Sequence, residues 1–174
     1  MGRVSDVRAE RFSRLYEDSY GAIHAYACRR AGHEAADEIA AETFLVAWRK
    51  FDALPAEPLP WLYGVARNVV LRHHNEHARR QRAWAALERE RSWSPLGSPD
   101  GDDPGLREAW EQLSAADREV LALVGWEQLS VADAARALGC SAPVFSVRLY
   151  RARRRLERLL TAAGALSTVE LSEA

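Results

Sequence analysis

Apolar residues recur at helical spacing along almost the whole chain, and the alternating pattern of a half-buried strand is almost absent. One stretch interrupts this periodicity, because residues 92–105 consist mostly of Ser, Pro, Gly and Asp. Such a composition is typical of a linker. The sequence therefore predicts an all-α fold with two small helical domains joined by a flexible acidic linker.

We expect the first domain at residues 8–83, the linker at 84–105, the second domain at 106–163 and a tail at 164–174. The formal net charge is only −1, which by itself argues against a protein that binds nucleic acid alone. The charge is unevenly distributed, however. Residues 148–158 hold six arginines and one glutamate, whereas residues 88–103 hold two arginines and five acids. This distribution favours a protein that contacts DNA when assembled with a larger partner.

The sequence shows no pattern typical of a targeting signal or a membrane-spanning helix. No apolar run approaches the ~20 residues that a membrane-spanning helix needs. The charged residues after Met1 leave no room for the apolar segment of a secretory signal. We therefore expect a cytoplasmic protein.

Sets of residues typical of a metal site or a catalytic site are not evident in the sequence either. Cys28 and Cys140 lie far apart and form no C-x-x-C pair, so buried free thiols are expected. His73 and His77 have the i, i+4 spacing of metal ligands, but no third ligand is evident. We therefore expect His73, His74 and His77 to form a polar helix surface. Neither paired carboxylates nor a nucleophile with its base is evident. We expect no enzymatic activity, no cofactor and no metal.

The second domain has the pattern of a helix-turn-helix. Ser114 precedes one helix as a candidate N-cap, and Ser130 precedes a second, short helix that Gly139 ends. Ser141 then caps a third helix, with Pro143 in its first turn, where a missing amide donor costs little. A short helix, a glycine turn and a basic helix are typical of a DNA-reading helix-turn-helix.

The third helix of that domain has two distinct stripes at spacings of three and four. The inward stripe is apolar: Phe145, Leu149, Ala152, Leu156 and Leu159. The outward stripe is basic: Arg148, Arg151, Arg155 and Arg158. A solvated surface is the alternative reading, but surfaces of that kind usually mix charges of both signs. The near absence of acids on this stripe favours DNA binding.

The first domain contains an acidic helix over 36–49, in which Ile39, Phe44 (or Thr43) and Trp48 fall on the inward side. A second helix, over 60–82, carries amides and guanidiniums on one face, the groups that bond base edges and phosphates: Asn68, Arg72, Asn75, Arg79 and Arg82. Trp61 and Tyr63 stand at its start. Their rings either stack on an unpaired base or belong to the core.

Taken together, five segments resemble the extracytoplasmic-function (ECF) group of sigma factors. They are residues 41–49, 60–68, 79–80, 117–121 and 148–153, in the order and with the linker that this group has. The resemblance spans about residues 12–160. It implies a sigma factor that binds core RNA polymerase and directs promoter-specific transcription initiation.

The resemblance also implies roles for individual residues. The clamp of the polymerase would be bound by Asp37, Glu38, Glu42, Phe44 and Trp48. The downstream promoter element would be read and melted by Trp61, Tyr63, Asn68, Arg72, Asn75 and Arg79, with Asn68 beside the pocket for a flipped base. The upstream element would be read by Ser146, Arg148, Arg151, Arg153 and Arg155.

The implied partners are core RNA polymerase and promoter DNA, both double-stranded and melted. Members of this group are commonly held inactive by an anti-sigma factor between the two domains, which makes such a protein a candidate partner. We expect a monomer when the chain is free. Two alternatives stay open: a conventional dimeric helix-turn-helix regulator, and an enzyme acting on nucleic acid.

Some residues depart from the pattern of the group. Ala41 replaces the glutamine that usually precedes the glutamate of the clamp-binding helix. Ser146 and Val147 replace a basic or small polar pair, and Phe145 is larger than the usual aliphatic residue. The loop over 52–58 is rich in proline. The promoter sequence preferred by the group therefore does not transfer to this chain.

Overall fold

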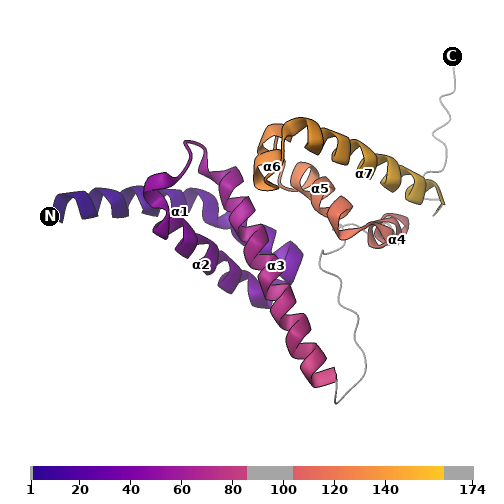
Figure 1. Cartoon of the computed structure of the whole chain (residues 1–174), viewed down its shortest axis with the longest axis horizontal. Coiled ribbons are helices and arrows are strands. Elements are labelled where there is room, and N and C mark those ends of the chain that lie inside the picture. Colours follow the sequence, from indigo (N-terminus) through magenta and orange to yellow (C-terminus); the bar gives the residue numbers. More distant parts are fainter. Residues whose placement is uncertain (1, 86–103, 163–174) are drawn as a thin grey trace.

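The first three α-helices pack against one another and form the N-terminal half of the molecule (Figure 1). The structure is a computed structural model, and it describes residues 2–85 and 104–162. Its N-terminal helices are α1 (Gly2–Ala31), α2 (His33–Arg49) and α3 (Pro58–Ala85), with a 3₁₀ turn, η1 (Phe51–Ala53), between α2 and α3. Gly32 joins α1 to α2 at φ +81°, a backbone conformation that suits glycine.

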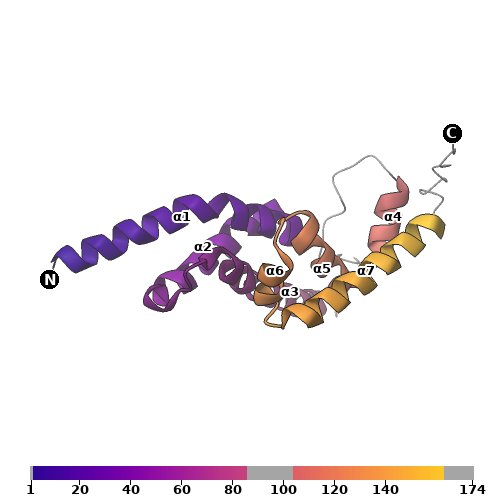
Figure 2. The same ribbon diagram turned by 90° about the horizontal axis from the view of Figure 1, so that it is seen from above.

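The core of this half is formed by the inward faces of the three helices. Its largest fully buried apolar side chains are Ile23, Tyr26, Ile39 and Leu62. Val69 and Val70 of α3 are also buried, as the helical periodicity predicts. The N-terminal end of α1 projects beyond the other helices in both views (Figures 1 and 2).

In the C-terminal half, residues 104–162 form the helices α4 (Pro104–Gln112), α5 (Ala115–Gly125), α6 (Val131–Ala137) and α7 (Ala142–Ala162). Ser114 and Ser130 cap α5 and α6 as predicted, each accepting a hydrogen bond from the backbone amide three residues on. Gly139 has φ +64° in the turn before α7. Phe145, Leu149 and Ala152 of the predicted inward stripe are buried. The helix-turn-helix is therefore formed by α6 and α7.

The all-α fold class is confirmed, since residues 2–85 and 104–162 contain helices and no strand. Most of the predicted linker and the predicted tail lie outside the described residues. Within the described part of the chain, no helix is long and apolar enough to cross a membrane.

The two halves also contact each other, with α6 packed against α3. A single apolar cluster contains buried residues of both halves, among them Leu62 of α3 and Phe145 of α7. Gly64 of α3 lies so close to α6 that a Cβ atom on it would stand 3.0 Å from the carbonyl oxygen of Ala137. The helix-turn-helix therefore contacts the first half of the molecule through α3.

Candidate nucleic-acid and polymerase interfaces

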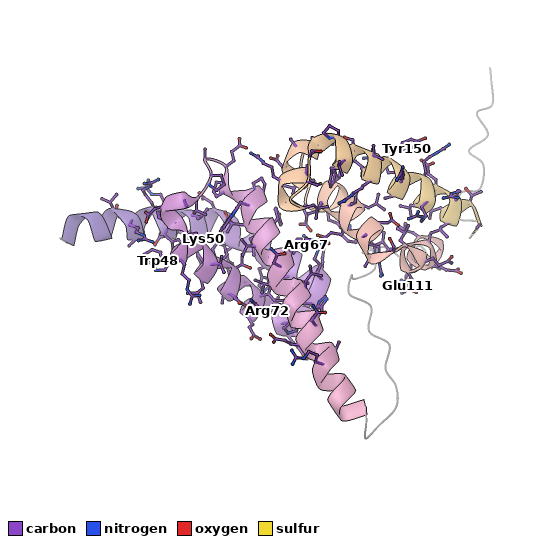
Figure 3. All side chains as sticks on the ribbon, viewed as in Figure 1. Trp48, Lys50, Arg67, Arg72, Glu111 and Tyr150 are labelled. Atoms are coloured by element: carbon purple, nitrogen blue, oxygen red, sulfur yellow. The ribbon has the colours of Figure 1, made fainter. Side chains whose placement is uncertain are left out.

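The outward side of α7 carries several exposed arginines. The predicted upstream-element residues Ser146, Arg148, Arg151, Arg153 and Arg155 are all exposed. Tyr150, with 63% of its surface exposed, projects from the same helix away from the other elements (Figure 3). Ser146 donates a hydrogen bond to the carbonyl of Ala142 over 2.9 Å, so its hydroxyl is engaged within the helix.

The arginines of α7 differ in their surroundings. Arg155 pairs with Asp117 at the start of α5, which ties α7 to that helix. Arg153 lies elsewhere, in a hollow that it lines together with Trp110 and Leu156. In the described ranges, no carboxylate lies at ion-pair distance from Arg148 or Arg151. These two guanidiniums are therefore available to phosphate or base edges.

A second basic face lies on α3. Asn68, Arg72, Asn75 and Arg79 are exposed along this helix, as the spacing predicts. The side chain of Arg82 lies outside the part of the structure that is described. Arg67 and Arg72 point to different sides of α3, Arg67 toward the second half (Figure 3). Arg72 also pairs with Glu42 of α2, so one predicted polymerase contact and one predicted DNA contact bind each other.

Trp61 and Asn68 share a cavity of about 440 Å³. Lys50, Arg67 and Arg72 line it together with apolar side chains such as Val65 and Val69. The end of α6 and the turn that follows it, residues 136–139, also line the cavity. Trp61 is half-buried at this cavity, so its ring is accessible there.

Tyr63 does not belong to this accessible surface. Only 3% of it is exposed, and its ring centroid lies 5.3 Å from that of Tyr26. Burial, together with the negative charge of Glu127, raises the pKa of its hydroxyl to about 12. In this structure the ring of Tyr63 belongs to the core, which was the alternative reading, and its stacking on a base stays a prediction.

On α2, the acidic residues predicted to bind polymerase are accessible. Asp37 and Glu38 are exposed, and Asp37 accepts a hydrogen bond from the hydroxyl of Tyr20 over 3.1 Å. Trp48 is 38% exposed at the C-terminal end of the helix, where the guanidinium of Arg8 stacks 4.8 Å above it. Leu45, which the sequence did not single out, adds an exposed apolar side chain to this surface.

Phe44 is a correction to the predicted polymerase contacts. It is 3% exposed and packs between the rings of Tyr16 and Tyr20, at centroid distances of 4.7 and 6.3 Å. A side chain held in this way stabilises the packing of α2 on α1 and has no surface left for a partner. The helical spacing that places Phe44 inward was therefore the better guide.

Sequence reasoning missed a cluster of buried charges between the two halves. Arg30 at the end of α1 donates hydrogen bonds of 2.9 Å to Glu119 and to Glu127. Arg29 also pairs with Glu127, and the hydroxyl of Tyr26 donates to Glu119 over 2.9 Å. The one signal in the sequence was that Arg30 continues the apolar stripe of α1 through Ile23 and Tyr26.

The remaining histidines and cysteines make local contacts. Both cysteines are free and partly buried, and Cys28 Sγ lies 3.3 Å from His33 Nδ1. His74 is half-buried, and desolvation with help from His73 lowers its pKa to about 4. Within residues 2–85 and 104–162, no group of three such side chains is arranged to hold a metal ion.

Two family models match the chain in the order of its two halves. Sigma-70 region 2 matches residues 15–83, and Sigma-70, region 4 matches residues 105–156. A helical chain with both regions, and with basic faces on α3 and α7, is a sigma factor of the Sigma-70 class.

Named relatives define the family more closely. The ECF RNA polymerase sigma factor EcfG of Rhodopseudomonas palustris is 30% identical over 82% of this chain and 81% of its own length. The ECF RNA polymerase sigma factor BldN of Streptomyces coelicolor is also 30% identical, over 91% of this chain. The chain spans 63% of the length of BldN. The protein belongs to the ECF RNA polymerase sigma factors, which are transcription initiation factors and not enzymes.

Solved structures agree with this assignment. The sigma factor RpoE of Bartonella quintana, in complex with the anti-sigma factor NepR, aligns with a TM-score of 0.66 and 26% identity over 87% of this chain and 98% of that chain. CnrH, in complex with the cytosolic domain of CnrY, shares the fold with a TM-score of 0.55 and 22% identity, over 87% and 88% of the two chains.

Proposed function

We propose that the protein binds core RNA polymerase and directs it to specific promoters, reading two promoter elements with its two helical domains. The observation that carries this proposal is the presence of two separate basic faces, on α3 and on α7, in one chain of the ECF family. The domains that carry them are residues 8–83 and 106–163, on either side of the linker.

The second domain reads the upstream element. The start of α7 enters the major groove, where Ser146 and Arg148 face base edges, and Arg151 and Arg155 meet phosphates further along. Arg155 has to share its guanidinium with Asp117. Arg153, on another side of the helix, contacts the flanking backbone. Because Arg148 and Arg151 have no competing carboxylate within the described residues, they contribute most to affinity.

The first domain binds the polymerase and melts the downstream element. The exposed surface of Asp37, Glu38, Leu45 and Trp48 on α2 docks on the clamp of the polymerase. Asn68 and Trp61 hold a base that has left the duplex, and Arg72, Asn75 and Arg79 follow the strand along α3. Glu42 holds Arg72 in place through their ion pair.

Binding energy, and not chemistry, drives this function. A helix-turn-helix with a few phosphate contacts binds DNA weakly and loses affinity as salt rises. Two such elements fixed on one polymerase gain from their high effective concentration. Capturing a flipped base then offsets a cost of a few kcal/mol for unstacking it. The protein works in the cytoplasm, where polymerase and promoter are found.

An anti-sigma factor is a further proposed partner. The support is the similarity to RpoE, whose solved structure contains the anti-sigma factor NepR. Such a protein would occupy surfaces of both domains and keep them from the polymerase.

A mobility-shift experiment at physiological salt tests the proposal. Promoter fragments from the genome of the same organism are mixed with the free protein, with core polymerase, and with both. We expect a specific shift only with both, and its loss in the Arg148→Ala/Arg151→Ala variant. The Arg107→Ala variant is the control, because Arg107 is exposed on α4, outside both proposed faces. Tight, specific binding by the free protein would instead indicate a conventional helix-turn-helix regulator.

A further inference from the structure

Apolar side chains lie among the arginines on the outward side of α7. Val144 is 44% exposed and Val147 is 49% exposed. Tyr150 extends this apolar surface by a further step of three residues and projects away from the other elements (Figure 3). Single exposed apolar side chains are common on protein surfaces. Here they follow one another along the outward side of the basic helix, and we call Val144 and Val147 the valine pair.

The helical register directs Val147 away from the core. Phe145 and Leu149, two positions before it and two positions after it, are both buried. At 3.6 residues per turn, two positions correspond to about 200° around the helix axis. Val147 therefore stands on the side of α7 opposite to the buried stripe, and its side chain contributes little to the packing of the domain.

The valine pair shares its side of the helix with two exposed arginines. Val144 precedes Arg148 by four positions, and Val147 precedes Arg151 by four. Side chains at this spacing lie one above the other on a helix. Within the described residues, no carboxylate lies at ion-pair distance from Arg148 or Arg151. An apolar surface beside positive charge of this kind complements DNA, whose grooves expose base edges between rows of phosphates.

The chemistry of the major groove identifies the group that an exposed valine can recognise. Thymine alone among the four bases presents a methyl group there, and apolar side chains contact it. The hydroxyl of Ser146, between the two valines, donates its proton to the carbonyl of Ala142 over 2.9 Å. Apolar contact is therefore a mode of reading that the start of α7 offers in addition to hydrogen bonds from Arg148.

We propose that Val144 and Val147 are specificity-determining residues that read thymine methyl groups in the upstream promoter element. This inference rests on the proposed function, in which the start of α7 enters the major groove. Residues spaced by three or four positions on a zinc-finger recognition helix contact successive bases. The valine pair has a spacing of three, so it selects thymines at neighbouring base pairs.

The size of a methyl group sets the expected effect. Loss of one methyl contact should weaken binding about fourfold, which corresponds to about 0.8 kcal/mol. Deoxyuridine pairs with adenine as thymine does and lacks only the 5-methyl group. Replacing a thymine by deoxyuridine therefore removes the proposed contact and leaves every hydrogen bond of the base pair in place.

The test uses the complex of the full chain with core RNA polymerase and a double-stranded promoter that this complex shifts. Each thymine of the upstream element is replaced in turn by deoxyuridine, and the affinity is measured by competition against the unmodified promoter. We expect two neighbouring positions at which the wild type loses about fourfold in affinity. Val144→Ala should abolish the loss at one of these positions and Val147→Ala at the other, as in a double-mutant cycle between protein and DNA.

Val7→Ala is the matched control, because Val7 is a valine of α1 that is 55% exposed and lies outside α7. It should leave the loss at both positions unchanged. The Val144→Ala and Val147→Ala variants should fold like the wild type, since both valines are exposed and alanine favours a helix more than valine does. Circular dichroism and thermal unfolding measure this before binding is compared.

A failure of this inference is distinguishable from a failure of the proposed function. If the wild type shifts a promoter with polymerase but no deoxyuridine weakens binding, the proposed function stands and the thymine readout is wrong. The same conclusion follows if both alanine variants keep the losses of the wild type. If the wild type shifts no promoter in the presence of polymerase, the proposed function is wrong and the thymine readout of an upstream element is wrong with it.

Discussion

Arg30 and Glu127 are 97 residues apart in the sequence, yet Nη1 of Arg30 donates a 2.9 Å hydrogen bond to Oε1 of Glu127 in the interior of the molecule. Burial opposes the charge of the guanidinium, but Tyr26, Glu119 and Glu127 outweigh that effect and raise the pKa of Arg30. This pair connects α1 to the turn that leads into the helix-turn-helix. It makes the relative position of the two domains a property of specific side chains.

Phe44 and Leu45 are adjacent in sequence but should respond differently to truncation. Phe44→Ala removes a buried ring, and we expect it to lower the free energy of unfolding by about 3–5 kcal/mol. Leu45→Ala removes an exposed side chain and should change that free energy by less than about 0.5 kcal/mol while weakening binding to core polymerase. Urea denaturation and a polymerase-binding titration measure the two effects. A stable Phe44→Ala protein with weak polymerase binding would restore Phe44 as a contact.

The substitutions Gly21→Ala and Gly64→Ala together test the contact between the domains. Both glycines lie within α-helices, but only Gly64 lies at that contact. A Cβ atom at Gly21 meets nothing within 4 Å, so Gly21→Ala should stabilise the protein by about 0.5–1 kcal/mol through helix propensity. The same atom at Gly64 stands 3.0 Å from the carbonyl oxygen of Ala137, so that gain should be lost. Thermal unfolding of both variants measures the difference, and equal stabilisation would show that α6 does not press on α3.

The serine caps of the second domain should contribute similar amounts. Ser114 and Ser130 each accept a 3.1 Å hydrogen bond from the amide three residues on. Replacing either by Ala should cost about 1 kcal/mol of unfolding free energy. Ser146→Ala is the control, because its hydroxyl bonds only to the preceding turn of its own exposed helix face. If all three variants lose the same stability, the capping assignments are wrong.

His74 should make the protein sensitive to mild acid. Desolvation lowers its pKa to about 4 in the folded chain, whereas an unfolded histidine titrates near 6.5. Above about pH 6.5 the ring is neutral in both the folded and the unfolded chain, so protonation of His74 does not lower the free energy of unfolding there. As the pH falls from about 6.5 to about 4, only the unfolded chain takes up the proton, and stability is lost.

The size of that loss should be about 1–2 kcal/mol, because solvent screens a ring that is only half-buried. Chemical denaturation at pH 7.5 and pH 4.5 measures it as a difference between wild type and His74→Gln, which removes the titrating group. His33→Gln serves as the exposed control. An identical acid loss in wild type and His74→Gln would contradict the assignment.

Local signals in the sequence predicted the helices of the second domain and the caps of α5 and α6. The spacing of apolar residues identified the inward stripe of α7. Ser114 and Ser130 marked the residues at which α5 and α6 begin. Each of these features depends on residues within a few positions of one another. The exposed face of α3 was also predictable, because residues three and four positions apart lie on the same side of a helix: Asn68, Arg72, Asn75 and Arg79.

Features that depend on distant contacts were not predictable in this way. The buried ion pairs join Arg30 to Glu119 and Glu127, which lie 89 and 97 positions away in the sequence. Helical periodicity carries no information about that pairing. Tyr63 and Phe44 show a related limit: an aromatic ring suits a base, a partner protein or a core equally well. Only the packing of Tyr26 on Tyr63, and of Tyr16 and Tyr20 on Phe44, decides between them.

Run-off transcription tests the central claim most directly. Core RNA polymerase is supplied with a promoter library from the same genome, with and without this protein. We predict specific transcripts that appear only with the protein, vanish in the Arg148→Ala/Arg151→Ala variant and persist in Arg107→Ala. No new transcripts in the presence of the wild-type protein, despite its confirmed binding to DNA, would contradict the account.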